Sequence, residues 1–362
     1  NGTIKMTARA DGTIRIEAVD SVYGEAALGS PQEVDVMVTV ESPASIEFSP
    51  PVLTQRALQG NDASNMTFEV WNGGGGDAMW KTAGNWGGTP VAAGNDLYFG
   101  GTAKLANTND WDEGTAFSSI TFNSGAGAFV LNGNGIALSG SVANSDNDIQ
   151  TINLPMALAA TQIFNASNGN LVANGVLSGA GGLTKAGVYA LTITNNNTYE
   201  GLTTVSTGSV IITHANALGA TAAGTTVNTS RGANLELRGG ITLAEPLTFT
   251  GGNVNKSCLV NGSGSNVISS TINTLGGRHV INAGSSLTLT GGATNNGFFV
   301  VNGGGTLYIR TTPFNLGTQT FYADDYTLTI LETVSNVWNE TTIAKGTVRM
   351  GVKNALPADK AI

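Results

Sequence analysis

Charged side chains are scarce in this chain, because Asp, Glu, Lys and Arg make up only 11% of its 362 residues. Acidic residues outnumber basic ones by 25 to 16, for a formal net charge of −9. No cluster of Lys and Arg is present that could neutralise a run of phosphates. The sequence therefore argues against nucleic acid as a partner.

Cysteine is nearly absent, and so are long apolar runs. The single cysteine, Cys258, excludes an intrachain disulfide and any multi-cysteine metal site. It lies between Ser257 and Leu259 in a strand-like run, which favours a buried, inert thiol over a nucleophile. No run of 18 apolar residues predicts a membrane-spanning helix, and the first residues are not a signal peptide. We expect a processed or excised part of a longer chain.

Glycine and apolar residues, by contrast, are abundant. The chain has 50 glycines and is 41% hydrophobic, so it can bury a core and is not disordered. Residues 1–45 alternate with period two, with Asp11-Gly12 where a tight turn belongs. This pattern predicts antiparallel strands from the end of an immunoglobulin-like sandwich. Pro50 and Pro51 then indicate a linker over 46–65.

The remaining chain, 66–362, opens with most of its tryptophans. Trp71, Trp80, Trp86 and Trp111 all lie within about 66–116, a segment that we expect to cap one end of a solenoid with bulky side chains. The alternative is an exposed platform on which these four rings contact carbohydrate.

Beyond residue 117 the sequence is a series of short β-prone runs separated by Gly and Asn, with no convincing helix between them. An internal repeat decides between a sandwich and a solenoid. Residues 203–210 recur as 341–348, and Asn216-Ala217-Leu218 recurs as 354–356, all at an offset of 138 positions. Self-similar short strand units are the sequence signature of stacked β-coils.

Residues 179–219 resemble the autotransporter-associated β-strand repeat. The match lies in Gly182-Leu183-Thr184-Lys185, Leu191-Thr192, Asn197-Thr198-Tyr199, Thr203-Thr204-Val205, Gly208 and Ala217-Leu218-Gly219. The resemblance implies an all-β fold, a right-handed single-stranded parallel β-helix, over 66–362. Leu202 departs from the pattern, which usually has a second glycine there, and the units between 220 and 335 are degenerate.

Enzymes that cleave polysaccharides also use parallel β-helices, and their chemistry requires acidic residues clustered on one face. The candidates are Asp324-Asp325, with Arg278-His279 in a different setting. Neither His214 nor His279 has an adjacent carboxylate, and we expect both to be surface or packing residues. The sequence predicts no catalytic residues and no cofactor, and hence no enzyme.

Two acidic patches have the residue types that bind hard cations. Asn144, Asp146 and Asp148 alternate like the first ligands of a calcium loop, but Ile149 replaces the required glycine and Pro155 the closing glutamate. The second patch, Asp110, Asp112 and Glu113 around Trp111, is expected to be a solvated turn. The sequence therefore predicts no metal site.

Together these observations predict a non-catalytic extracellular rod, part of a repetitive, structural or adhesive surface protein of a Gram-negative bacterium. One alternative is a self-assembling filament subunit, because a three-stranded edge and an open coil end could each pair with a second copy. The other is a β-helix that binds or cleaves carbohydrate, with Trp338 as a further stacking surface. The expected partners are accordingly the chain itself or surface glycans.

Overall fold

A computed structural model describes residues 69–251, 256–274, 277–294, 298–358 and 360–362, together with the backbone of three strands nearer the N-terminus. The chain divides into two compact units, Asn1–Met66 and Thr67–Ile362. The predicted domain boundaries at 45 and 65 remain predictions, since the linker 46–65 lies outside the described residues.

The first unit contains three antiparallel strands, β1 (Thr3–Ala8), β2 (Ile14–Val19) and β3 (Val34–Val36). Strand β2 lies in the middle and pairs with both neighbours. The alternating pattern therefore forms strands as expected. The predicted turn at Asp11-Gly12 lies outside the described residues, and the immunoglobulin-like assignment remains a prediction.

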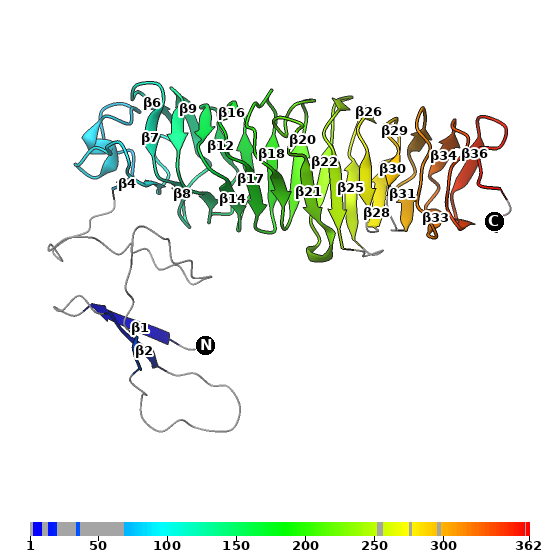
Figure 1. Ribbon diagram of the computed structural model, residues 1–362. Coiled ribbons are helices and arrows are strands. Elements are labelled where there is room, and N and C mark those ends of the chain that lie inside the picture. The colour runs from blue at the N-terminus through cyan, green and yellow to red at the C-terminus, as the bar shows by residue number, and fades with distance from the viewer. Residues whose placement is uncertain are drawn as a thin grey trace. The chain divides into compact units, whose positions relative to one another are not determined.

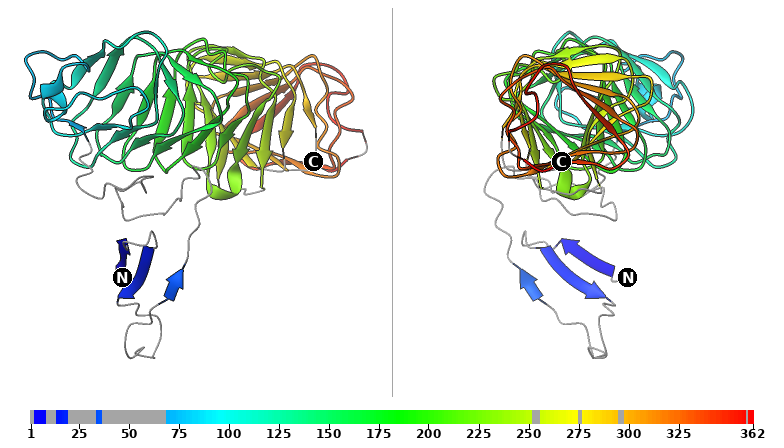
Figure 2. Two further views of the ribbon diagram at one scale, coloured as in Figure 1. Left: turned by 60° about the vertical axis from the view of Figure 1, so that its left-hand side comes forward. Right: turned by 90° about the vertical axis from the view of Figure 1, so that its right-hand side faces the viewer.

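The second unit is a parallel β-solenoid of about 12 turns, as the sequence predicted (Figure 1). Seen along the rod, successive turns superimpose around a common interior (Figure 2). Within the described residues, helical structure is limited to the short 3-10 turns η1 (Ala83–Trp86) and η2 (Thr229–Arg231).

Each turn contributes strands to the faces of the rod, and every strand pairs in parallel with its counterparts in adjacent turns. The first face is an 11-stranded sheet of β4 (Val70–Trp71), β5 (Leu97–Phe99), β8 (Ile120–Phe122), β11 (Val142–Asn144), β14 (Gln162–Ala166), β17 (Leu183–Ala186), β19 (Thr203–Val205), β21 (Thr225–Asn228), β24 (Leu247–Thr250), β27 (Ile272–Thr274) and β30 (Ala293–Thr294). The second is a 12-stranded sheet of β6 (Ala106–Asn109), β9 (Val130–Gly133), β12 (Gln150–Ile152), β15 (Leu171–Ala173), β18 (Ala190–Ile193), β20 (Ser209–Ile212), β22 (Asn234–Leu237), β25 (Ser257–Asn261), β28 (Gly277–Ile281), β31 (Phe299–Asn302), β33 (Thr320–Ala323) and β35 (Glu340–Ile343).

The third face is interrupted. A four-stranded sheet of β7 (Thr115–Phe117), β10 (Ile136–Leu138), β13 (Met156–Leu158) and β16 (Leu177–Ser178) ends before a six-stranded sheet of β23 (Thr242–Leu243), β26 (Ser265–Ile268), β29 (Ser286–Leu289), β32 (Thr306–Ile309), β34 (Leu328–Leu331) and β36 (Thr347–Met350) begins. Between them, residues 195–202 and 213–224 cross this face without strands.

The interior consists of columns of side chains, because register pairs each inward residue with the inward residue of the next turn. Ile120 pairs with Val142, and Val142 with Phe164, at a spacing of 22 residues per turn. All three side chains are fully buried, whereas the residues next to each of them in its own strand are partly exposed. Strands about 4.8 Å apart thus stack apolar side chains along the whole rod.

In the first recognisable repeat, the motif Asn197-Thr198-Tyr199 joins neighbouring turns by buried hydrogen bonds. The Asn197 carboxamide accepts from the Leu177 N–H (2.8 Å) and donates to the Ala217 carbonyl (2.7 Å). The Tyr199 hydroxyl lies 2.6 Å from the hydroxyl of Thr203. The motif therefore satisfies buried backbone groups where this face lacks strands.

The second repeat forms the same arrangement around Asn336, with one change of residue type in the side chains that bond. The Asn336 carboxamide accepts from the Phe314 N–H (2.8 Å) and donates to the Ala355 carbonyl (2.7 Å). Trp338 replaces the tyrosine, and its indole N–H donates to the Thr341 hydroxyl (2.8 Å). The repeat in the sequence is therefore a repeat in hydrogen bonding.

Candidate functional site

The tryptophans of the first turns form a buried cluster. Trp71, Trp80 and Trp86 are at most 2% exposed. The ring centroids of Trp71 and Trp86 are 5.2 Å apart, and that of Phe99 lies 5.5 Å from Trp86, all in edge-to-face contact. The Trp80 indole N–H donates to Asn107 Oδ1 at 2.7 Å. The protein itself therefore surrounds these rings.

These three rings therefore belong to the core and do not form the exposed carbohydrate platform that was the alternative. Their faces close the first turns of the solenoid and are not accessible to a sugar. Trp338 is likewise buried, with its ring stacked 5.3 Å from that of Phe321. Large apolar rings at the end of a solenoid stabilise the fold more when they cover its interior than when they face water.

Trp111 differs from the other tryptophans because it is partly exposed. Its ring contacts Phe117 at 6.5 Å between centroids, and the Lys81 ammonium lies 5.2 Å from its centroid. Its indole N–H is buried and has no hydrogen-bond partner. A carbohydrate contact at Trp111 remains a prediction, with a cation already over the ring.

The first acidic patch builds a turn. Asp146 accepts hydrogen bonds from the N–H groups of Gly125 (2.7 Å) and Asp148 (2.9 Å). The Asn144 carboxamide donates to the carbonyls of Asp148 (2.9 Å) and Asn170 (3.0 Å). These side chains bind backbone rather than pointing at a common centre. In the part of the chain that the structure describes, no three His, Cys, Asp or Glu side chains come together as metal ligands would.

The second acidic patch also binds neighbouring backbone. Asp110 accepts from the Lys81 N–H at 2.8 Å, and Glu113 accepts from the Gly135 N–H at 2.8 Å. Asp112 is fully exposed and lies 3.8 Å from the Lys81 ammonium. Asp110 and Asp112 therefore contact the same residue, Lys81, while Glu113 contacts the following turn. Asp112 and Glu113 are both exposed.

The candidate polysaccharide-cleaving residues do not meet. Asp324 and Asp325 occupy an exposed turn after β33, where Asp324 accepts from the Asp325 N–H at 2.8 Å. His279 points into the core from β28 and is 1% exposed. His214 accepts from the Asn216 N–H at 3.1 Å in a turn of the rod. No acid and base are held across a common space by these residues.

Cys258 and His279 come together in a way that the sequence did not predict. The Cys258 sulfur lies 3.6 Å from His279 Nδ1, and both side chains are buried. The His279 ring stacks on Phe299 with centroids 3.7 Å apart. Burial raises the pKa of the thiol to about 12 and lowers the pKa of the imidazole to about 3. The pair is therefore neutral and closed to solvent, unlike a nucleophile and its base.

The burial of Lys185 was likewise not predicted from the sequence. Its ammonium donates to the carbonyls of Ala186 (2.7 Å), Gly187 (2.8 Å) and Thr207 (3.1 Å). Burial lowers the pKa of this amine to about 8. Three acceptors match the three N–H donors of an ammonium, so Lys185 fixes a corner of the coil.

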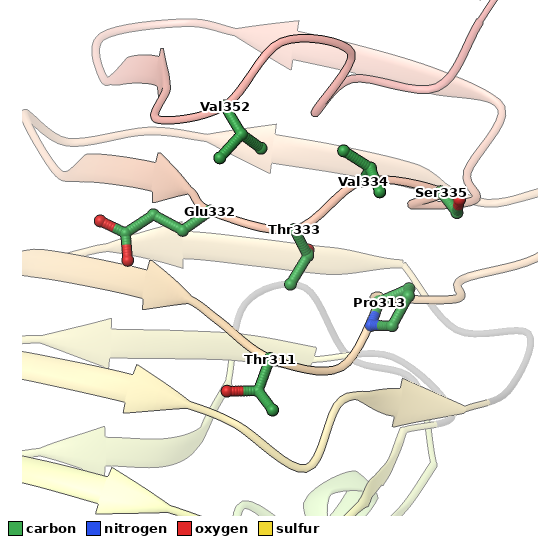
Figure 3. A pocket seen from close by; sticks show the side chains of 7 residues that line it. All are labelled: Thr311, Pro313, Glu332, Thr333, Val334, Ser335 and Val352. Atoms are coloured by element: carbon green, nitrogen blue, oxygen red, sulfur yellow. The ribbon is translucent and has the colours of Figure 1, made fainter.

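A cavity of about 310 Å³ opens at a corner of the rod near β32, β34 and β36. Its lining comes from three neighbouring turns (Figure 3): Thr311, Pro313, Glu332, Thr333, Val334, Ser335 and Val352. The Glu332 carboxylate is paired with the Arg310 guanidinium, and Thr311 and Ser335 have positive φ angles of 68° and 61°. Most of the lining is exposed, so this is an open hollow.

No known protein-family model matches this chain, and no solved structure matches it. Among curated proteins, the chain is similar to the adhesin BmaC autotransporter of Brucella suis biovar 1 (strain 1330), with 30% identity over 246 residues. The match covers 65% of this chain and 6% of that protein's length. Within the described residues, the structure contains no helix of the length and hydropathy that a membrane span requires.

Proposed function

We propose that this chain is a non-catalytic, adhesive or structural element of an extracellular surface protein of a Gram-negative bacterium. The observation that carries the proposal is the 246-residue similarity to an autotransporter adhesin in a chain that folds as a continuous parallel β-solenoid. A solenoid of stacked turns is a rigid spacer, because each turn is held by its neighbours along the whole rod.

The surface chemistry supports contact over a long face rather than in a pocket. On the outer side of the 11-stranded sheet, Thr184, Thr204, Thr226 and Thr248 are partners in register in successive turns. All four are partly exposed and lie about 4.8 Å apart along the rod. Many weak contacts of hydroxyl groups with a glycan-covered surface would add up through multivalency.

Adhesion of coated beads tests the proposal directly. Beads carrying the whole chain are applied to a glycan array and to cultured cells, and we expect retention above that of beads carrying an unrelated protein. The double substitution Thr204→Lys and Thr226→Lys should reduce retention, whereas Thr192→Lys on the 12-stranded sheet should not. Retention equal to that of the unrelated protein, or release of sugar from the array, would contradict the proposal.

Negative-stain electron microscopy over a concentration series separates a spacer from a filament. Isolated rods at every concentration are the expected result. Regular fibres that lengthen with concentration would instead support the alternative of a self-assembling subunit.

A further inference from the structure

Glu245 is a carboxyl group buried inside a rod that has few charges. It lies between β23 and β24 and is 1% exposed. Its Oε1 accepts a hydrogen bond from the Thr225 hydroxyl at 3.0 Å. Its Oε2 is buried and has no hydrogen-bond partner. Burying a carboxylate with an unpaired oxygen is costly, so this arrangement favours the neutral acid.

The surroundings supply hydroxyl groups but no positive charge. In register, Thr203 and Thr225 stand between Leu183 and Leu247, so two polar residues interrupt an apolar column. The Thr203 hydroxyl contacts that of Tyr199 and donates to the Leu218 carbonyl at 3.3 Å. The hydroxyls of Tyr199 and Thr203 contact each other, and that of Thr225 bonds to Oε1. None of them pairs with Glu245 Oε2.

The titratable groups near Glu245 are few. The strands packed around it, β19, β21, β23, β24 and β27, contain no Asp, Glu, Lys, Arg or His. The phenol of Tyr199 is the titratable group that interacts with Glu245, and the charge of the Glu245 carboxylate helps to raise the pKa of this phenol, after the larger effect of burial. On the adjoining turns, Glu200 is exposed and His214 accepts from Asn216. The ion pairs formed by described residues do not include Glu245.

The direction of the pH effect follows from this geometry. Burial raises the pKa of Glu245 from an ordinary 4.5 to about 7. Below pH 4.5 the carboxyl is neutral in both the folded and the unfolded chain, and the stability of the fold is fully present. Between pH 4.5 and 7 the unfolded chain ionises first, so stability is lost as pH rises through the folded pKa.

We propose that Glu245 makes one section of the rod, residues 199–250, a pH-sensitive element that is held closed in mildly acidic conditions and opens more readily above neutral pH. The adjoining turns bury titratable groups of their own, Lys185 in β17 and His279 in β28, but neither is a carboxyl. Further from this section, the interior column at β11 and β14 is apolar, where Val142 and Phe164 are paired. The rod would therefore loosen locally while its other turns stay closed.

Hydrogen exchange measured by mass spectrometry on the whole chain tests this inference. Rates at pH 5 and pH 8, corrected for intrinsic exchange, give the opening equilibrium of each turn. We expect opening of β19, β21 and β24 to increase about 10- to 100-fold from pH 5 to pH 8. The strands β11 and β14 serve as an internal reference and should change much less.

Two variants complete the test. Glu245→Gln keeps the shape of the side chain but does not titrate, so the pH dependence of β19, β21 and β24 should disappear. Glu200→Gln removes an exposed carboxyl beside Tyr199 and should leave the pH dependence of these strands unchanged. Equal opening at both pH values in the wild type, relative to β11 and β14, would overturn the inference even if Glu245→Gln fails to fold. A pH dependence that persists in a folded Glu245→Gln chain would overturn it as well.

Discussion

Replacing Asn197 by alanine removes both hydrogen bonds by which one buried carboxamide joins three successive turns. Asn197 is 3% exposed, and its partners are the N–H of Leu177 one turn earlier and the carbonyl of Ala217 one turn later. Both partner groups are buried and would be left without a hydrogen bond. Asn197→Ala therefore perturbs polar satisfaction on the face that lacks strands, and it leaves the apolar columns in place.

The expected magnitude follows from the two orphaned groups. Each buried group without a partner costs about 1–3 kcal/mol, so the loss of stability is about 2–6 kcal/mol for the turns concerned. The neighbouring Asn196 provides a matched control, because it is exposed and its carboxamide oxygen accepts a single bond from Asn216. Asn196→Ala should change stability by no more than about 0.5 kcal/mol.

Local measurement is required because a solenoid opens turn by turn. Hydrogen exchange of peptides from 171–220 reports the opening free energy of the affected turns, and peptides from 120–144 report a distant reference. We expect Asn197→Ala to weaken the first set and not the second. Protection of 171–220 equal to wild type would refute the reasoning, since it would mean that both orphaned groups find other partners at no cost.

Three further changes probe other parts of the rod. Trp80→Ala should destabilise the first turns by about 3–5 kcal/mol, seen as faster hydrogen exchange over 97–122, because it empties the buried aromatic cluster; unchanged exchange there would contradict a core role. Gly133→Ala should lower the free energy of unfolding in urea titrations more than Gly125→Ala does. Both glycines have positive φ angles, 104° and 82°, but a Cβ at 133 would lie 2.2 Å from the Asn109 carbonyl oxygen, while that at 125 meets open space. Equal losses would show that torsional strain alone matters. The thiol of Cys258 should resist maleimide in the native chain and react in urea, because burial raises its pKa to about 12; fast native labelling would argue against a closed core.

Much of the fold was predictable because a β-solenoid repeats local information. Alternation of apolar and polar residues, as in Leu191-Thr192-Ile193, predicts which side of each strand is buried, and the structure confirms it. The 138-residue repeat predicted stacking, and the same hydrogen bonds form around Asn197 and around Asn336, which lies one position outside that register. Aromatic crowding near the start predicted bulky side chains at that end, and Trp71, Trp80 and Trp86 pack together there.

The candidate sites were less predictable, because contact between turns depends on the number of residues in each turn. Register partners lie 20 residues apart at Leu183 and Thr203, 22 apart at Thr225 and Leu247, and 24 apart at Leu235 and Leu259. A change of one residue in any corner would bring different side chains together. Sequence periodicity thus determined that the chain stacks strands around an apolar interior. The tertiary structure alone decided which polar groups share that interior, because their neighbours belong to other turns.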